Sequence, residues 1–242
     1  MITVDPVNDE PQIADIVTQN GLEDTDTLIT DIQISDVDES DDPAAIYNVT
    51  VSVDSGLLSF LSDIESDFGV IIETATLPAA SVEISGTIAD INVALANGIN
   101  FSPDADFYGT VKATVDVNDN GNFPSDPKSA TKEFDIEVLA DNDAPENTVP
   151  TDITVDEGGE VKVTGIQVSD VDYSGMFASS NIQVTLSADV GTINVVTANA
   201  NVVITDNSSG AVVLSGPIDD VNAVLAEMAV TDGVFYSNPQ NG

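Results

Sequence analysis

A short motif, Asn-Asp-x-Pro, occurs at residues 8–11 and again at residues 142–145, and similar sequences follow both copies. The segment Ile-Gln-Ile-Ser-Asp-Val-Asp at 32–38 returns as Ile-Gln-Val-Ser-Asp-Val-Asp at 166–172. The two copies start 134 residues apart, at residues 8 and 142. This spacing is typical of a compact domain that occurs in tandem. We therefore predict a linker at 1–11, a first module at 12–140, a joint at 141–145 and a second module at 146–242.

The hydrophobic periodicity within each module predicts short β-strands. Tyr47–Val53 has the clearest period of two, with Val49, Val51 and Val53 expected to face the core. Other segments are consistent with strands: 28–34 (Ile32 and Ile34 inward), 57–60, 81–85, 111–117 and 133–138. Only residues 87–96 change to helical spacing, with Thr87 as a plausible N-cap and Asn97-Gly98 as the end. We expect an all-β fold with one short helix in each module.

The second module has no counterpart of residues 111–138. It is therefore predicted to be incomplete and to lack its last strands, which would leave one sheet edge unpaired. Either the chain was cut at this point or a neighbouring chain supplies the strands, and we favour the first alternative.

The charge of the chain excludes several partners. It has 43 acidic residues against four lysines, no arginine and no histidine, which gives a net charge of −39. Nucleic acid is not expected as a partner, because phosphate neutralisation needs lysine or arginine, and anionic membrane surfaces are excluded for the same reason. No apolar run is long enough for membrane insertion. A halophilic or marine origin would explain most of the acidity, but not why acids gather at the module ends.

The joint itself brings carboxylates and an amide together at residues 141–143. Like charges about 4 Å apart repel by roughly 4 kcal/mol near a protein surface. A Ca²⁺ ion would offset this repulsion, because it binds about six to eight oxygen ligands from carboxylates, amides and carbonyls. With cysteine absent, a metal could also replace disulfides as a staple.

Four features together resemble the cadherin-like tandem repeats of large bacterial surface adhesins and related secreted proteins. They are the alternating strands, the Asp-x-Asp at 36–38, the Phe-Ser-Pro-Asp-Ala-Asp-Phe-Tyr-Gly run at 101–109 and Asn-Asp-x-Pro at the joint. The resemblance covers both modules. It implies tandem Greek-key β-sandwiches with Ca²⁺ bound between neighbours, and an extracellular location.

The resemblance also assigns metal ligands. An interdomain set comprises Glu23, Asp104, Asp106, Asp141, Asn142, Asp143, Asp170 and Asp172. A partial N-terminal set comprises Asp5, Asn8, Asp9, Asp36 and Asp38, and its other half would belong to a preceding module. The Asp-x-Asn-x-Asn-Gly run at 116–121 matches only the first half of an EF-hand loop, so we interpret it as a polar hairpin loop. Asp119 could then be an outer contributor to the interdomain set.

The sequence predicts that the chain is not an enzyme, because it lacks histidine, cysteine and the common catalytic motifs. We expect a calcium-stabilised adhesion or spacer segment whose partners are neighbouring repeats of the same protein. The alternative is a module that binds polysaccharide through Ca²⁺. A third possibility is adhesion by Ca²⁺-dependent self-association.

Overall fold

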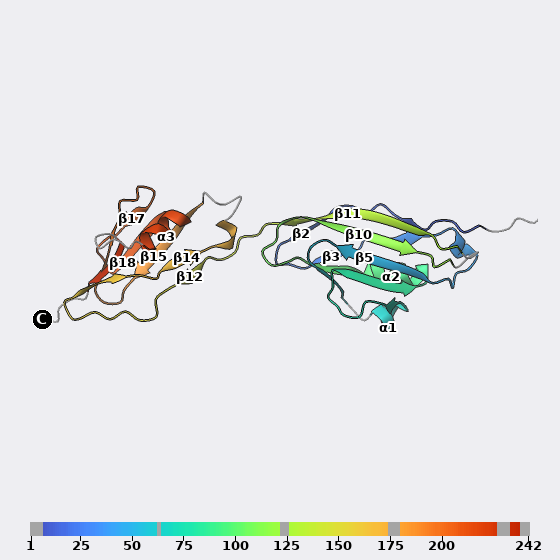
Figure 1. The fold of residues 1–242 in the computed structure, drawn as a ribbon, viewed down its shortest axis with the longest axis horizontal. Coiled ribbons are helices and arrows are strands. Elements are labelled where there is room, and N and C mark those ends of the chain that lie inside the picture. The colour runs from blue at the N-terminus through green and yellow to red at the C-terminus, as the bar shows by residue number, and fades with distance from the viewer. Residues whose placement is uncertain (1–6, 62–63, 122–125, 174–179, 227–232, 238–242) are drawn as a thin grey trace, which may run out of the picture. The chain divides into compact units, whose positions relative to one another are not determined.

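The computed structural model describes residues 7–61, 64–121, 126–173, 180–226 and 233–237. The chain forms two compact units, Met1–Asp141 and Asn142–Gly242 (Figure 1). The division falls inside the predicted joint.

The described residues of the first unit form three sheets. The largest has six strands in the order β2 (Gln19–Leu22), β11 (Ser129–Leu139), β10 (Gly109–Asn118), β5 (Tyr47–Val53), β8 (Ser81–Gly86) and β7 (Ile71–Ile72). A second sheet has the order β3 (Thr27–Ile29), β9 (Ile99–Ser102) and β6 (Leu57–Phe60), and β1 (Gln12–Ile13) pairs with β4 (Ile34–Ser35). Side chains from the sheets form one apolar core, as expected of a sandwich.

Strand β5 lies in the middle of the six-stranded sheet, with β8 on one side and β10 on the other. Val49, Val51 and Val53 are buried as predicted, and the intervening residues are more exposed. The hairpin β10–β11 contributes seven buried apolar side chains to the core: Val111, Ala113, Val115, Val117, Phe134, Ile136 and Val138. The parallel pairing of β11 with β2 then closes this side of the unit.

The helix predicted at 87–96 is α2 (Ile88–Asn97). The Thr87 hydroxyl accepts a hydrogen bond from the Asp90 N–H, which satisfies one of the free donors at the helix start. Ile88, Ile91 and Leu95 are buried on one face, and Gly98 ends the helix with a φ of 103°. The helix, its N-cap at Thr87, its apolar face and its end at Asn97-Gly98 were predicted.

Two features of the first unit differ from the prediction. Residues 28–34 do not form one strand, because β3 and β4 belong to different sheets, although Ile32 and Ile34 are buried as expected. A second short helix, α1 (Ile64–Phe68), follows β6, and a 3₁₀ turn, η1 (Asp38–Ser40), follows β4. The described residues of the first unit therefore contain two α-helices, whereas one was predicted.

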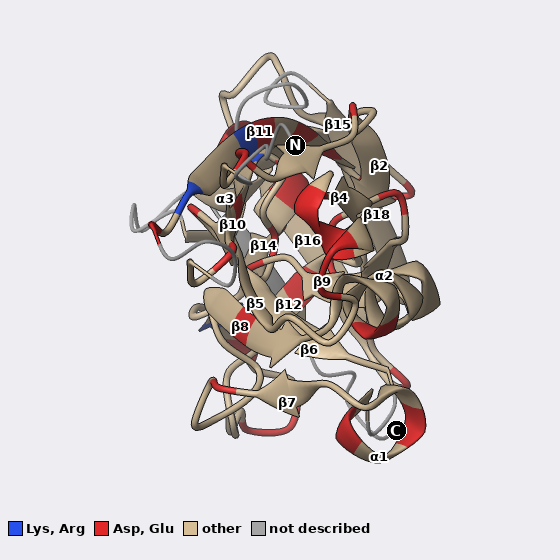
Figure 2. Cartoon of the chain, turned by 90° about the vertical axis from the view of Figure 1, so that its right-hand side faces the viewer, with Lys and Arg blue, Asp and Glu red and all other residues tan. Residues whose placement is uncertain are grey.

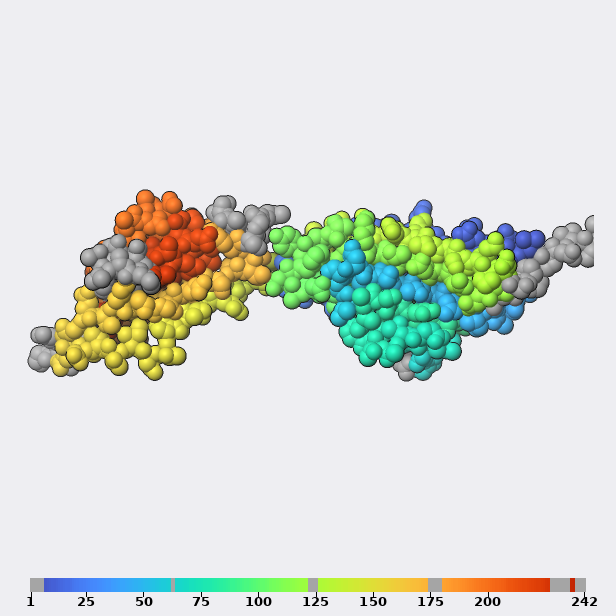
Figure 3. Space-filling view, in the orientation of Figure 1, coloured from blue at the N-terminus to red at the C-terminus, as the bar shows by residue number. Residues whose placement is uncertain are grey.

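The second unit repeats part of this plan. It contains β12 (Glu146–Thr148) paired with β14 (Gln167–Ser169), and a sheet with the order β13 (Glu160–Val163), β19 (Gly233–Ser237) and β16 (Thr192–Val196). A third sheet has the order β15 (Asn181–Ser187), β18 (Ala211–Pro217) and β17 (Val203–Thr205). The 3₁₀ turn η2 (Val171–Tyr173) and the helix α3 (Ile218–Ala226) correspond to η1 and α2. In the space-filling view, the yellow residues that begin this unit run along one side of it (Figure 3).

Strand pairing shows that the two units share one register. Val49 lies opposite Ile84 in the first unit, and Val184 lies opposite Leu214 in the second. These are the residue pairs that the sequence repeat makes equivalent. The fold is all-β with short helices, as the sequence predicted, and among the described residues no helix has the length and apolarity that a membrane span needs.

Candidate metal centre

An asparagine in each helix positions the strand that precedes the Asp-x-Asp motif. In the first unit, Asn92 accepts a hydrogen bond from the Ile34 N–H at 2.9 Å and donates one to the Ile34 carbonyl at 2.8 Å. In the second unit, Asn222 makes the same two bonds to Val168 at 2.9 and 2.7 Å. Each helix therefore fixes the backbone two residues before the first aspartate.

The Asp-x-Asp motif has the same local geometry in both units. The Asp36 carboxylate accepts a hydrogen bond from the Asp38 N–H at 2.9 Å, and the Asp170 carboxylate accepts one from the Asp172 N–H at 3.0 Å. This is the local side-chain-to-backbone bond that favours aspartate in turns. The second carboxylate of each motif then contacts the segment that begins its own unit.

That preceding segment is held in the same way in both units. The Asp9 N–H donates to the Asp38 carboxylate at 2.7 Å, and the Asp143 N–H donates to the Asp172 carboxylate at 2.6 Å. Both donors belong to the Asn-Asp-x-Pro motif. The repeated motif is thus a segment fastened by its backbone to an aspartate of its own unit.

Buried polar groups surround the motif in the first unit. Asn8 and Asp119 are 6% and 1% exposed, and the Asn8 amide donates to the Asp119 carboxylate at 2.6 Å. Asp119 also accepts hydrogen bonds from the Gly121 and Lys128 N–H groups, both at 2.8 Å. Asp119 therefore lies with the N-terminal set. The suggestion that it contributes to the interdomain set was wrong, because the β10–β11 hairpin loop lies beside Asn8.

Asp36 is the exception among these groups, because one of its oxygens has no partner. It is 9% exposed, and its Oδ2 atom is buried without a hydrogen bond from any described residue. Burial raises the pKa of the Asp36 carboxyl and the charges of Asp38 and Asp119 act in the same direction, while hydrogen bonding from the Asp38 N–H and the Tyr47 hydroxyl partly opposes the rise in this pKa. Burial and the charge of Asp36 likewise raise the pKa of Tyr47 above its usual range. A buried carboxylate oxygen without a hydrogen bond is costly, and a cation beside it would offset that cost.

A hollow of about 410 Å³ opens beside Asp36. Its lining comes from both the N-terminal segment and the turn after β4: Asp9, Glu10, Gln12, Ser35, Asp36 and Val37. This space is large enough for an ion with bound water.

The other end of the first unit presents a second set of carboxylates. Glu23 is 4% exposed, and its carboxylate accepts a hydrogen bond from the Asp141 N–H at 2.7 Å. The Asp24 carboxylate accepts a hydrogen bond from the Asp106 N–H at 3.1 Å. Asp24 and Asp106 both have positive φ, of 53° and 56°, which aspartate tolerates better than most residues.

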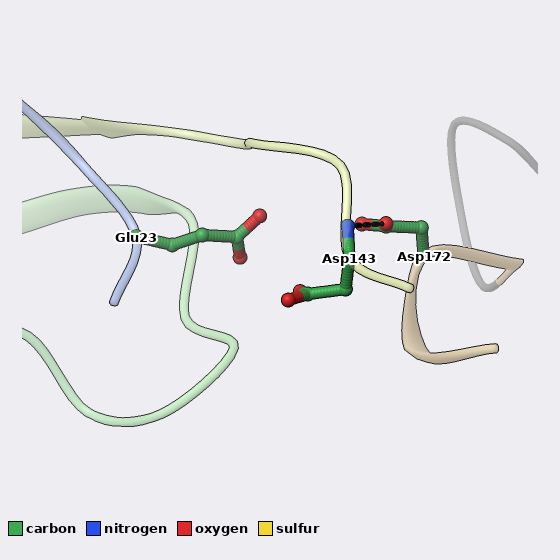
Figure 4. Close-up of side chains that lie close together, drawn as sticks. All are labelled: Glu23, Asp143 and Asp172. Atoms are coloured by element: carbon green, nitrogen blue, oxygen red, sulfur yellow. Dashed lines mark hydrogen bonds between the residues drawn. The ribbon is translucent and has the colours of Figure 1, made fainter. Parts of the chain in front are cut away.

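Carboxylates among the described residues could contribute to metal binding in each unit. They are Glu23, Asp24 and Asp106 in the first unit and Asp143 and Asp172 in the second. Figure 4 shows the hydrogen bond from the Asp143 N–H to the Asp172 carboxylate within the second unit.

The predicted interdomain residues fall into three categories. Glu23 and Asp106 of the first unit and Asp143 and Asp172 of the second are among these carboxylates, and the Asp141 N–H donates to Glu23. Asp104 and Asp170 are not: the Asp104 carboxylate accepts hydrogen bonds from the Ser55 hydroxyl and the Gly56 N–H, and the Asp170 carboxylate accepts one from the Asp172 N–H. The Asn142 amide donates to the Asp143 carbonyl.

Of the predicted N-terminal set, Asp5 lies outside the described residues. Asp9, Asp36 and Asp38 are joined by hydrogen bonds through their backbone N–H groups. Asn8 is held by Asp119, and none of these residues appears in a three-carboxylate group among the described residues.

Sequence reasoning missed Asp24 and the role of the two helix asparagines. Asn92 and Asn222 occupy equivalent positions in the repeat, so their recurrence was a usable signal. Asp24 has no counterpart of the same type, because Gly158 follows Glu157, and its contact with Asp106 depends on the folded loops.

The donors gathered here are carboxylate and amide oxygens, which fit a hard cation such as Ca²⁺. The chain offers no cysteine or histidine, the ligands typical of structural zinc sites. Figure 2 shows acidic residues on many elements and few lysines. Two lysine ion pairs occur among the described residues, Lys112 with Asp135 and Lys132 with Asp15, so protein cations neutralise very few of the carboxylates.

Comparison with known proteins gives little further information. Neither a family model nor a curated protein matches the chain. A similar solved structure is an endo-fucoidan hydrolase variant from glycoside hydrolase family 107, with 15% identity and a TM-score of 0.26. The match covers 99% of this chain and 29% of that one.

This neighbour contradicts the prediction that the chain is not an enzyme, and we withdraw that prediction. A match at this identity and TM-score assigns no activity or substrate to the chain.

Proposed function

We propose that the chain is a calcium-stabilised adhesion or spacer segment of an extracellular, multi-repeat protein. In this proposal Ca²⁺ binds where the Asn-Asp-x-Pro segment meets the Asp-x-Asp motif. The ion stiffens each joint, so that an array of modules can hold a distal binding domain away from its anchor. The motifs that resemble cadherin-like repeats support the class of protein.

The observation that carries the proposal is the Asp36 carboxylate. Its Oδ2 atom is buried without a partner, it borders an open hollow, and Asp38 and Asp119 add negative charge nearby. A cation in this hollow would bind the Oδ2 atom and offset the nearby negative charge. At the N-terminal end, Asp36, Asp38 and Asp9 would hold the ion, while Asn8 and Asp119 secure the segment.

The repeated hydrogen bonds support a second site at the joint. The Glu23 carboxylate accepts from Asp141, and the Asp172 carboxylate accepts from Asp143. Because these donors are only two residues apart, their Cα atoms can be separated by no more than about 7.6 Å. A carboxylate of each unit is therefore tied to the same three-residue segment. In this proposal an ion bound by Glu23, Asp143 and Asp172 would make that segment stiff.

The net negative charge of the chain explains why Ca²⁺ should strongly increase the stability of the folded state. In a chain with a net charge of −39, self-repulsion opposes compaction, and four lysines cannot offset it. Ca²⁺ bound only to the folded state would stabilise it by mass action, by about 2.7 kcal/mol at a free concentration 100 times the dissociation constant.

A calcium titration tests the proposal. The metal-free chain is titrated with Ca²⁺ by calorimetry and followed by thermal unfolding, with Mg²⁺ in parallel. We expect Ca²⁺ to bind and to raise the unfolding temperature of both units, with Mg²⁺ having a smaller effect, because Mg²⁺ dehydrates reluctantly. Small-angle scattering should show a narrower distribution of distances between the units in Ca²⁺.

Matched variants locate the ions. Asp38→Ala should abolish binding at the N-terminal segment, and Asp172→Ala should abolish binding at the joint, since each removes the carboxylate that holds its segment. Asp67→Asn, an exposed acid on α1, is the control and should leave both sites unchanged. A calcium-insensitive unfolding temperature and scattering profile would rule out the proposed stiffening.

Two further assays separate this function from the alternatives. A spacer should wash off insoluble polysaccharides with and without Ca²⁺, whereas a polysaccharide-binding module should be retained in Ca²⁺. Sedimentation with Ca²⁺ should show a monomer, whereas self-adhesion would give larger species.

A further inference from the structure

The strand that precedes each Asp-x-Asp motif has a single neighbouring strand. Among the described residues, β4 pairs only with β1, and β14 pairs only with β12. Ile34 of β4 lies opposite Ile13, and the next pair is joined by a hydrogen bond from the Ala14 N–H to the Gln33 carbonyl. Hydrogen-bonded and non-hydrogen-bonded pairs alternate in an antiparallel ladder, so the Ile34 N–H and carbonyl point away from β1. Their partners must come from the other side of the strand.

A helix asparagine supplies both partners. Helix α2 packs against β4, and α3 packs against β14. The Asn92 amide bonds both backbone groups of Ile34, and the Asn222 amide bonds both backbone groups of Val168. Ile34 and Val168 are each 2% exposed, so without these bonds their polar backbone groups would be buried and unpaired. Each asparagine side chain thus takes the place of a second neighbouring strand.

The asparagine occupies an unfavourable position for its residue type. It is the fifth residue of α2 and also the fifth residue of α3. Asparagine is a poor helix former, because its side chain competes for backbone hydrogen bonds. The preceding residues, Ile91 and Val221, are 0% exposed and anchor the two helices in their cores. Both repeats therefore keep a helix-weakening residue at the point where its amide reaches the strand.

We propose that Asn92 and Asn222 are positioning residues that set the Ca²⁺ affinity of the Asp-x-Asp motif in their own units. The first aspartate of each motif comes two residues after Ile34 or Val168, so a shift of the held residue would move the carboxylates. Groups that orient metal ligands without touching the ion typically change its affinity by about 10–100-fold when they are replaced. The inference rests on the proposed calcium function and adds the residues that hold its ligands in place.

A third asparagine provides a matched control. In the second unit, Asn207 accepts a hydrogen bond from the Val195 N–H at 2.7 Å and donates one to the Val195 carbonyl at 2.8 Å. Val195 is also 2% exposed, but no Asp-x-Asp motif follows it. Asn207→Ala therefore removes the same pair of bonds from a buried residue that does not lead to a proposed metal ligand.

The experiment compares the full chain with its Asn92→Ala, Asn222→Ala and Asn207→Ala variants. Each metal-free protein is titrated with Ca²⁺ while NMR follows the amides of Asp38 and Asp172. We expect Asn92→Ala to weaken Ca²⁺ binding at Asp38 by about 10–100-fold and to leave binding at Asp172 unchanged. Asn222→Ala should do the reverse, and Asn207→Ala should change neither affinity.

Hydrogen exchange separates positioning from a general loss of stability. In the metal-free chain, Asn92→Ala should speed exchange of the Asp38 N–H several-fold, because that group donates to Asp36. Protection of the β5 amides shows that the first unit stays folded. Should that protection be lost, Asn92→Asp replaces Asn92→Ala, because it keeps the acceptor for the Ile34 N–H and loses only the donor.

The outcomes distinguish this inference from the calcium function. An unchanged Ca²⁺ affinity at Asp38 in the folded Asn92 variant would overturn the inference. So would an equal loss of affinity at Asp172 in Asn207→Ala and Asn222→Ala. A wild-type chain that does not bind Ca²⁺ would refute the calcium function instead. The positioning role would then be retained by faster exchange of the Asp38 N–H in the Asn92 variant and overturned by unchanged exchange.

Discussion

Replacing Asp36 by asparagine should have opposite effects on stability with and without Ca²⁺. In the metal-free protein, the wild-type chain contains a buried carboxylate oxygen without a partner. Such a group costs about 1–3 kcal/mol, and more when charged. Asp36→Asn keeps an oxygen that can accept from the Asp38 N–H and removes the charge that faces Asp38 and Asp119. We therefore expect it to stabilise the metal-free first unit by about 1–2 kcal/mol.

With saturating Ca²⁺ the order should reverse, because the variant loses a charged ligand. Hydrogen exchange of the β5 amides measures the stability of the first unit alone, and calorimetric unfolding should agree with it. In EDTA, the variant should unfold about 4–8 °C above the wild type; in Ca²⁺, it should unfold below it. The control Asp67→Asn should not change sign between the two buffers.

The pH dependence provides an internal check. The pKa of the Asp36 carboxyl is raised in the folded, metal-free state. Protonated Asp36 therefore favours folding at low pH, and this contribution is lost as pH rises from its unfolded value of 3.8 through the raised folded value. The advantage of asparagine in EDTA should be present at neutral pH and absent well below 3.8. If Asp36→Asn destabilises the chain equally in both buffers, the reasoning about Asp36 is refuted.

Three further predictions follow from single contacts. Asp119→Asn retains the oxygen that faces the hairpin loop but loses the bond from Asn8, so it should cost about 1.5–3 kcal/mol in denaturant unfolding; an unchanged midpoint would show that Asn8 is not held. Hydrogen bonds from two side chains of β9 lower the pKa of Asp26 below 3.8. Its contribution to stability should be present above that value and lost as pH falls through the lower folded value, and a carboxyl NMR midpoint at or above 3.8 would contradict this. Gly98→Ala should lower the free energy of unfolding by about 1–2 kcal/mol, because Gly98 has a φ of 103° and the added Cβ would lie 2.5 Å from Leu28. The comparison variant is Ala96→Gly, at an exposed position of α2 where the backbone φ is not positive.

Much of the fold was predictable because it depends on local patterns. The period of two in Tyr47–Val53 determines which side chains are buried, and the spacing of Ile88, Ile91 and Leu95 determines the face of α2. Thr87 was recognisable as the N-cap because only the first turn of the helix is involved. The split of residues 28–34 was not predictable, since hydrophobic spacing does not report the point at which a chain passes from one sheet to another.

The candidate site was only partly predictable for a related reason. The motif residues Asp36, Asp38, Asp143 and Asp172 were identifiable from their recurrence. The distinction between Asp104, which caps the turn at Gly56, and Asp106, which lies beside Asp24, requires the conformation of two loops. The position of Asp119 against Asn8 likewise depends on where the β10–β11 hairpin ends.

The amino-acid sequence by itself determined the two-module repeat, the strands and helix of each copy, and an acidity that protein cations cannot neutralise. These properties depend on residue type and spacing, which the chain carries before it folds. Tertiary structure alone decided that Asp36 has a buried oxygen without a hydrogen bond from the described residues and that Asp119 lies against Asn8. Both are statements about what surrounds a group after distant segments have packed, and no local pattern contains that information.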